Sequence, residues 1–347
     1  MLEVLDIINN SQVRQDWEKL LTASGLKYDP PYSVIYGIYE EGQLLATGAR
    51  DQNRLKCIAI HPDHQGGPLF NQLLSGLISD AYEAGQERLF LYTQPQAVEA
   101  FGHLGFRSLA STSEGISFME RGQPDFDDYL AVLVQQVQAY EALHGPPQGP
   151  VESIVMNANP FTLGHRALVE DALTRAKRLH LFVLSEDSSL VPADIRLRLV
   201  QEGTADLAGI LIHPSDHYII SRASFPSYFL KKITEATEVQ ASLDALLFRD
   251  RIAPALGISQ RTVGDEPFDQ VTYLYNRCLK EIFHGKLGLT SLPRLASQDG
   301  MAISASRVRG LLMAGDRKLI RSLVPETTYR FFKSAQGKRL VDSWLAD

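Results

Sequence analysis

The sequence has little of what marks several special classes of protein. Its 347 residues include two cysteines, Cys57 and Cys278, which lie far apart and form no CxxC pattern, so neither a disulfide framework nor a zinc site is expected. No stretch reaches the about 18 apolar residues that a membrane helix needs. Residues 1–12 lack the basic start and apolar run of a signal peptide. We therefore expect a cytoplasmic protein.

An excess of positive charge is missing as well. The chain has 34 Lys and Arg against 41 Asp and Glu, a formal net charge of -7. This disfavours non-specific nucleic-acid binding, which usually needs a basic face, but leaves room for a local basic pocket. The 44% hydrophobic and 22% charged residues are ordinary for a globular protein. The length predicts two domains, because one core rarely serves so many residues.

The chain divides at a run of proline and glycine. The segment 144–150, HGPPQGP, can continue neither a helix nor a central strand. A helical pattern over 126–143 precedes it, and an abrupt apolar strand over 153–156 follows. We therefore expect one domain over residues 1–146 and a second over 150–347.

Both parts are expected to be α/β. In the first part, a mixed sheet is predicted from strands over 32–39, 43–50, 55–60 and 88–92, with a helix over 69–84. In the second, the strand over 153–156 is followed by a helix over 164–178 and a strand over 180–184. Strand, helix and strand in that order predict a βαβ unit in a Rossmann-like parallel sheet.

The first functional motif opens the helix of that βαβ unit. In an open parallel sheet, ligands bind outside the carboxyl ends of the strands. A helix N-terminus at that place offers free N–H groups and partial positive charge, which suits a phosphate. Thr162 and His165 are three apart and share a face, and Gly164 between them permits close approach. Thr-Leu-Gly-His resembles the T/HxGH motif of the nucleotidyltransferase superfamily.

A second motif strengthens this interpretation. Residues 303–309, ISASRVR, match the ISxSxxR pattern of the same superfamily. Ser304 is a good N-cap for a following helix, and Ser306 and Arg309 then lie on one face. Arginine holds its charge and can bind two phosphate oxygens at once. Either motif alone also fits an ordinary capped helix, but both in this order favour a nucleotide site.

Further candidates come from the chain between the two motifs. Gly264 and Glu266 lie in a strand end and turn, near which superfamily members bind adenine and ribose, although a plain loop fits equally well. Arg196 is a candidate phosphate contact from a neighbouring helix, although such residues are more often solvated. The resemblance implies catalytic roles for Thr162, His165 and Arg309. It implies ATP contacts from Asn157, Phe161, Thr162, Gly164, His165, Gly264, Glu266, Ser304, Ser306 and Arg309.

Longer segments are similar to the citrate lyase ligase family. They are residues 155–172, 203–207, 218–231, 252–258 and 263–268. The resemblance implies an enzyme that uses acetate and ATP to form acetyl-adenylate, releasing pyrophosphate. It then transfers the acetyl group to the thiol of the phosphoribosyl-dephospho-CoA group on the acyl carrier protein of citrate lyase, releases AMP and so activates the lyase. Neither nucleic acid nor a membrane is an expected partner.

The implied chemistry suits the candidate residues. Acetate is already a carboxylate nucleophile, so adenylation needs no dedicated base; it needs positioning and neutralisation of the triphosphate charge. The resemblance also implies Mg²⁺. We expect phosphates and water to hold most of its coordination positions, with no metal cage from the protein.

The first part resembles the GNAT acetyltransferase fold. Its loop at 58–70 contains Gln65 of the Q/R-x-x-G-x-G/A pattern, and the sequence LGF at 104–106 is typical of the same fold. Pro68 and Phe70 occupy the two small positions of that pattern. Proline has no N–H to donate, and phenylalanine crowds the approach to the loop. We expect impaired or absent acetyl-CoA catalysis; recognition of the carrier protein or its CoA-like arm is an alternative use.

Four other functions stay open at this stage. A true acetyltransferase would need acetyl-CoA rather than ATP, and Pro68 and Phe70 disfavour it. A small-molecule adenylyltransferase would leave a dinucleotide-like product instead of free AMP. An equivalent acetate ligase could serve malonate decarboxylase. A binding module with the fold but no chemistry is disfavoured by the intact Thr162, His165, Ser306 and Arg309.

Overall fold

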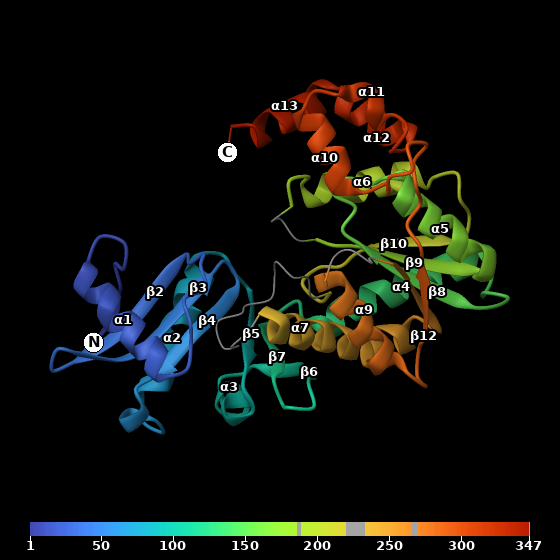
Figure 1. Cartoon of the computed structure of the whole chain (residues 1–347). Coiled ribbons are helices and arrows are strands. Elements are labelled where there is room, and N and C mark those ends of the chain that lie inside the picture. The colour runs from blue at the N-terminus through green and yellow to red at the C-terminus, as the bar shows by residue number, and fades with distance from the viewer. Residues whose placement is uncertain (186–188, 220–232, 266–269, 347) are drawn as a thin grey trace. The chain divides into compact units, whose positions relative to one another are not determined.

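The computed structural model describes residues 1–185, 189–219, 233–265 and 270–346, which fall into two compact units (Figure 1). Unit 1 is Met1–Tyr129 with Phe225–Leu246, and unit 2 is Leu130–Ser224 with Leu247–Asp347. The grouping is not collinear with the chain, and the expected domain limits at 146 and 150 stay a prediction. None of the described helices is long and apolar enough to cross a membrane.

Unit 1 is built on a seven-stranded mixed sheet in the order β1-β2-β3-β4-β5-β7-β6. Its strands are β1 (Leu2–Val4), β2 (Val34–Glu40), β3 (Gln43–Asp51), β4 (Arg54–Ile60), β5 (Arg88–Thr93), β6 (Arg107–Ser111) and β7 (Ser117–Gly122). The helices of its described part are α1 (Ser11–Ala23), α2 (Leu69–Glu83), α3 (Val98–His103), the first turn of α4 (Phe126–His144) and nearly all of α7 (Ile233–Leu247).

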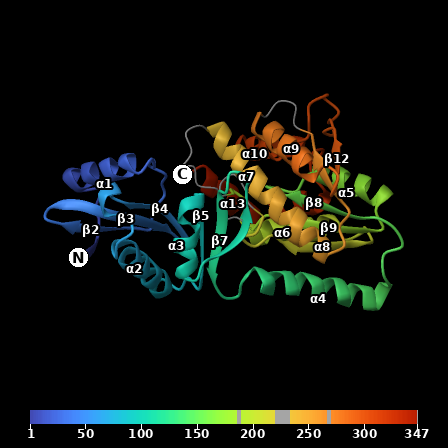
Figure 2. The same ribbon diagram turned by 90° about the horizontal axis from the view of Figure 1, so that it is seen from below.

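The sheet of unit 1 is covered on two faces and opens at one place. Figure 2 shows α1 and α2 on opposite faces of the strands β2 to β4, which explains why β3 is buried along nearly its whole length. The strands β4 and β5 run parallel, and a single residue pair, Arg54 with Phe90, joins them. The two strands therefore diverge toward their carboxyl ends, and this divergence creates room for a pocket.

Unit 2 contains a five-stranded sheet, parallel throughout, in the order β10-β9-β8-β11-β12. Its strands are β8 (Val151–Met156), β9 (Arg178–Val183), β10 (Ile210–Pro214), β11 (Gln260–Gly264) and β12 (Gly288–Leu292). Its helices in the described part include α5 (Leu163–Arg175), α6 (Ala193–Gly203), α8 (Ala253–Ala255), α9 (Gln270–Phe283), α10 (Ala305–Met313), α11 (Arg317–Ile320), α12 (Glu326–Lys333) and α13 (Ala335–Trp344).

The strand order of unit 2 fixes where a ligand site can form. From β8 the chain moves outward through β9 to β10, and it later continues on the other side of β8 through β11 to β12. Figure 1 shows α5 and α6 on one face of this sheet and α9 on the other. The direction of winding thus reverses between β8 and β11, and doubly wound sheets bind ligands at the carboxyl ends of such a pair.

The βαβ unit expected from the sequence is present with shifted limits. The helix ends at Arg175 rather than at residue 178, and β9 already begins at Arg178. The reason is the parallel pairing with β8: the Lys177 N–H donates to the carbonyl of Pro150 at 2.9 Å, which starts the ladder that joins Val151 to Arg178. A helix continued to residue 178 would break this pairing.

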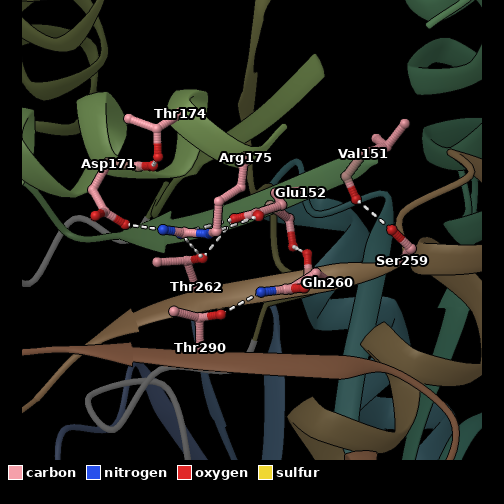
Figure 3. A network of polar contacts seen from close by, with 10 residues as sticks. Val151, Glu152, Asp171, Thr174, Arg175, Ser259, Gln260, Thr262 and Thr290 are labelled. Atoms are coloured by element: carbon pink, nitrogen blue, oxygen red, sulfur yellow. Dashed lines mark hydrogen bonds and ion pairs between the residues drawn. The ribbon is translucent and has the colours of Figure 1, made fainter. Parts of the chain in front are cut away.

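A buried polar network joins the strands near the amino end of the sheet (Figure 3). The Glu152 side chain is 1% exposed and accepts hydrogen bonds from Thr262 Oγ1 at 2.8 Å and from Arg175 Nε at 3.2 Å. Arg175 also pairs with Asp171 one turn earlier in α5. Arg175 therefore compensates the buried charge of Glu152 and joins α5 to the strands β8 and β11 at this end of the sheet.

Two buried histidines connect β9, β10 and α4 within unit 2. His180 Nδ1 lies 2.9 Å from His213 Nε2, and His213 Nδ1 lies 2.7 Å from Gln136 Oε1. Neither imidazole is exposed. Burial lowers the pKa of His180 to about 3 and that of His213 to about 4, so both rings are neutral at neutral pH.

Candidate active site

The turn between β8 and α5 holds the first motif in a fixed geometry. Thr162 is the N-cap of α5, and its Oγ1 accepts the His165 backbone N–H at 3.3 Å. The Thr162 N–H in turn donates to His165 Nδ1 at 3.1 Å, which completes a capping box. Because Nδ1 accepts this hydrogen bond, the neutral imidazole carries its proton on Nε2. The turn therefore offers an N–H donor at the positive end of the helix.

Thr162 and Phe161 support this histidine rather than face the solvent. Thr162 is 1% exposed and Phe161 is fully buried. The Phe161 ring lies nearly parallel to the His165 ring, at 12° and a centroid distance of 5.9 Å. On its other side it packs on Gly203, where an added Cβ would lie 2.6 Å from the ring. Both side chains were expected to contact ATP, and the structure places them where they orient His165.

The second motif lies at the start of α10. Ser304 is the N-cap, and its Oγ accepts the Arg307 N–H at 3.2 Å. The Arg309 guanidinium donates to Ser306 Oγ at 3.1 Å and to the carbonyl of Asn159. Burial lowers the pKa of Arg309 from its usual value, although a guanidinium stays charged in proteins. The arginine of the second motif is therefore anchored on the turn that precedes the first.

A second contact joins the two motifs at Gly164. A Cβ added there would lie 3.1 Å from the carbonyl oxygen of Ile303, closer than nearly all real Cβ contacts. The glycine thus allows α5 to begin directly against the residue that precedes the N-cap of α10. The two motifs expected to act together, far apart in the sequence, are brought together in space.

Arg196 has a role different from the expected phosphate contact. It is fully buried, and its guanidinium donates to the carbonyl oxygens of Val191, Asn157 and Leu184 at 2.6–3.0 Å. It also donates to Asn157 Oδ1 at 2.6 Å. Arg196 differs from the expected phosphate contact because it is buried and its donors are used by backbone carbonyls. It holds together the two loops that follow β8 and β9.

The remaining candidates lie at the carboxyl edge of the same sheet. Asn157 is exposed directly after β8, and its amide nitrogen donates to Ser189 Oγ at 3.2 Å. Gly264 ends β11, and its carbonyl accepts from Asn276 Nδ2 at 3.2 Å. A Cβ at Gly264 would meet Leu168 at an ordinary 3.6 Å, so close packing does not require this glycine. Glu266 lies outside the described residues.

Arg294 is a site residue that sequence reasoning missed. It follows β12 at the carboxyl edge of the sheet, and the next residue, Leu295, accepts the Ile303 N–H at 2.8 Å. Ile303 in turn contacts Gly164, so Arg294 lies one short segment away from His165. The sequence shows that Arg294 is an arginine just past the last strand of a parallel sheet. It does not show that Arg294 lies near His165, because that depends on the hydrogen bond between residues 295 and 303.

The charges of the site favour a polyanion. Burial and the positive charge of Arg294 together lower the pKa of His165 to about 4, so the ring is neutral at neutral pH. The site thus combines a neutral N–H donor, two guanidinium groups and the N-terminus of α5. Such a set can hold a triphosphate and stabilise charge that develops on the α-phosphate and on pyrophosphate.

Unit 1 contains a pocket of a different kind. It has a volume of about 510 Å³ and lies where β4 and β5 diverge. It is lined by the ends of these strands, by Gln65, Gly66 and Gly67 of the following loop, and by residues of α2 and α3. Phe70 lies in its wall and meets the Phe101 ring edge-on at 5.2 Å. None of the described residues that line it is an Asp, Glu, Lys or Arg.

Unit 2 is an α/β domain with a doubly wound parallel sheet and the motif residues at its switch point, and unit 1 is an α/β domain with a mixed sheet. The model of the citrate lyase ligase C-terminal domain matches residues 151–332. The model of the acetyltransferase (GNAT) domain matches residues 26–120. The α/β fold class expected for both parts is confirmed.

Curated relatives match nearly the whole chain. The [citrate [pro-3S]-lyase] ligase of Klebsiella pneumoniae is 34% identical over 95% of this chain and 96% of its own length. That of Escherichia coli K12 is 36% identical over 91% and 89%, and that of Haemophilus influenzae is 34% identical over 91% and 94%. The chain therefore belongs to the citrate lyase ligase family, and the enzyme class expected from the sequence is confirmed.

Proposed function

We propose that this enzyme activates acetate with ATP and transfers the acetyl group to the thiol of the prosthetic group on the acyl carrier protein of citrate lyase. The observation that carries the proposal is the assembly of His165 and Arg309 around the N-terminus of α5, at the switch point of the sheet. Membership of the family supports the ligase part of the proposal. We further propose that the reaction takes place in the cytoplasm.

In the first half of the reaction, an acetate oxygen attacks the α-phosphorus of ATP. The bond to the β,γ-pyrophosphate breaks, and acetyl-adenylate and pyrophosphate result. His165 donates from Nε2 to a phosphate oxygen, since its Nδ1 is occupied by the Thr162 N–H. Arg309 and Arg294 neutralise charge on the phosphates. Mg²⁺ bound to the phosphates would neutralise further charge, and the oxygen donors of ATP and water suffice to hold it.

In the second half, the thiolate of the carrier's prosthetic group attacks the acetyl carbonyl carbon. The bond to the phosphate oxygen of AMP breaks, so a thioester forms and AMP leaves with the electron pair. The thiol proton passes to solvent or to the departing phosphate. The groups that hold the α-phosphate in the first half are the groups that stabilise AMP as a leaving group here, so one constellation serves both steps.

The test is ATP–pyrophosphate exchange by the full chain in the presence of magnesium, with and without acetate and without any carrier protein. We expect exchange that depends on acetate, since acetyl-adenylate forms reversibly before the acceptor binds. Exchange that is the same without acetate would contradict acetate activation. Absence of exchange, with ATP binding demonstrated by calorimetry, would favour transfer of AMP to a small molecule instead.

The acceptor is tested separately from the activation step. Labelled acetate is incubated with enzyme, ATP and either the purified carrier subunit of citrate lyase or that of malonate decarboxylase. We expect stable label on the citrate lyase carrier, removable by hydroxylamine as a thioester is. Label on the malonate decarboxylase carrier alone would contradict the proposed acceptor and leave the acetate activation intact.

A further inference from the structure

The last helices of unit 2 are rich in positive charge, in contrast to the rest of the chain. Residues 317–344, which span α11 to α13, contain seven Lys and Arg and two acidic residues, Glu326 and Asp342, a net charge of +5. The whole chain has a net charge of -7. We name the seven side chains the basic C-terminal surface; they are Arg317, Lys318, Arg321, Arg330, Lys333, Lys338 and Arg339. All but Arg317, which is partly buried, are exposed.

This charge is only slightly compensated within the chain. Glu326 lies 3.1 Å from Arg330 and 3.8 Å from Arg321, and these two are the ion pairs that the described residues form with the surface. The two arginine side chains are nevertheless 76% and 67% exposed. Arg321 and Lys333 lie on the Tyr329 ring, at 5.4 and 5.5 Å from its centroid. Arg321 and Lys333 therefore lie together at the Tyr329 ring, and Glu326 joins Arg330 to Arg321.

Apolar side chains are exposed on the same helices. Met313 at the end of α10 is 39% exposed, and Leu319 of α11 is 47% exposed. Apolar groups within a charged rim are typical of protein interfaces, whereas phosphate-backbone binding uses cations with few apolar contacts. The patch therefore fits a protein partner with an acidic surface better than a nucleic acid.

The patch adjoins the nucleotide site through backbone contacts. The Leu163 N–H, in the first turn of α5, donates to the carbonyl of Leu323 between α11 and α12 at 2.9 Å. The chain also passes directly from α10, which carries Arg309, into α11. Figure 1 shows α10 to α13 gathered beside α5 and α6. A protein seated on this patch would stand next to the residues proposed to hold the adenylate.

We propose that the basic C-terminal surface docks the acidic face of the carrier protein that presents the acceptor thiol. The inference rests on the proposed function, because that function supplies a protein acceptor. Exposed interface charges mainly steer encounter and are screened by salt. The surface should therefore set the affinity for the carrier and leave acetate activation unchanged.

The test compares the full-length enzyme with the double variants Arg321→Glu/Lys333→Glu and Arg321→Gln/Lys333→Gln. Lys286→Glu is the matched control, an exposed charge reversal in unit 2 before β12, at the amino end of the sheet. Four quantities are measured at low and high salt: acetate-dependent ATP–pyrophosphate exchange, acetyl transfer to the carrier subunit of citrate lyase, calorimetric binding of that subunit, and binding of an RNA probe. Neither binding measurement depends on the reaction.

We expect kcat/KM for the carrier to fall about tenfold in the Glu variant and less in the Gln variant, with the salt dependence reduced. ATP–pyrophosphate exchange by both double variants, and all activities of the control Lys286→Glu, should match the wild type.

Unchanged carrier binding in the Glu variant would overturn the proposal, as would equal losses of exchange and transfer. Loss of binding to an RNA probe with carrier binding intact would assign the surface to nucleic acid instead. Absent exchange in wild type, with carrier binding still sensitive to the variants, would contradict the proposed function alone.

Discussion

The pocket of unit 1 and the proposed nucleotide site of unit 2 both form at the carboxyl ends of parallel strands, yet their linings differ in charge. The unit 1 pocket is lined by amides such as Gln65 and by apolar side chains such as Phe70, without a carboxylate, lysine or arginine among its described residues. The unit 2 site gathers Arg294 and Arg309 at a helix N-terminus. Similar strand geometry thus permits different ligand chemistry, and the side chains of the loops determine which kind of ligand each site can bind.

The difference separates two tasks. A neutral, amide-bearing wall suits an extended neutral ligand and offers no group of suitable charge to neutralise a triphosphate. The nucleotide site offers cations and a fixed N–H donor, as transition-state stabilisation of phosphoryl chemistry requires. Acetate activation should therefore depend on unit 2 residues and be insensitive to changes in the unit 1 pocket.

The largest effect that tests this comparison is expected for His165→Ala. Loss of one preorganised donor should lower acetate-dependent ATP–pyrophosphate exchange by about 100-fold or more. His284→Ala, an exposed histidine of the same unit, is the control and should behave as wild type. Exchange within a few-fold of wild type in His165→Ala would remove His165 from the mechanism.

The second prediction concerns acid stability, which should differ between the units. His180 and His213 bind protons in the unfolded chain below a pKa of about 6.5, but burial holds their folded pKa values at about 3 and 4. The unfolded state therefore takes up protons first as pH falls from about 6.5 toward 4. For each histidine that stays neutral, the free energy of unfolding should fall by about 2 kcal/mol between pH 7 and pH 5.

Thermal unfolding followed across that pH range measures this effect. The described histidines of unit 1 are all at least partly exposed, so the acid-sensitive transition should belong to unit 2. The double variant His180→Gln/His213→Gln should reduce the pH dependence, and His165, whose folded pKa is also about 4, should account for part of the remainder. If the unfolding of unit 2 depended on pH equally in the wild type and in this variant, the acid sensitivity would not come from His180 and His213.

Arg294→Gln is expected to have a smaller effect. Removal of one charged phosphate contact should lower kcat/KM for ATP about tenfold, mainly through KM. The same change should raise the pKa of His165, because the positive charge of Arg294 helps to lower it. Histidine resonances in an NMR titration report this pKa. A reduced activity without any change of the His165 pKa would mean that Arg294 acts through the fold alone; Lys286→Gln is the control.

The smallest effect is expected at Phe70 of unit 1. Phe70→Ala should leave ATP–pyrophosphate exchange unchanged within experimental error, because the nucleotide site lies in unit 2. Calorimetry with acetyl-CoA should show binding weaker than about 0.1 mM in the wild type, since Pro68 lacks an N–H and Phe70 crowds the loop. Tight binding of acetyl-CoA, with acetyl transfer in the absence of ATP, would restore the acetyltransferase interpretation for unit 1.

Much of the fold was predictable because local patterns and global structure agree. The strands β2 to β5 and the helix α2 follow from alternating or periodic apolar residues, and the βαβ unit from β8 to β9 follows in the same way. The two motifs were found because residue type and spacing carry the chemistry. In the structure the two motifs lie side by side, because Gly164 packs against the carbonyl oxygen of Ile303.

Other features depend on contacts that no local pattern records. Arg196 resembles a solvated helix residue in sequence, yet the two loops that follow β8 and β9 provide its acceptors and bury it. Arg294 reaches the site only because Leu295 pairs with Ile303. The grouping of residues 233–246 with unit 1 also depends on tertiary contacts. The distant contacts are Asn157 with Arg196, which are 39 residues apart, and Gly164 with Ile303, which belong to the two separate motifs.

The contact between Gly164 and Ile303 also has a consequence for the order in which the protein is made. Synthesis proceeds from the N-terminus, so the ribosome releases α5 and most strands of the sheet well before Ile303 and Arg309 emerge. A nascent chain that ends before residue 303 lacks the arginine of the second motif, so the proposed triphosphate site is incomplete in it. The proposed ATP site is therefore completed late in synthesis, after the last strand of the sheet, β12, has been made.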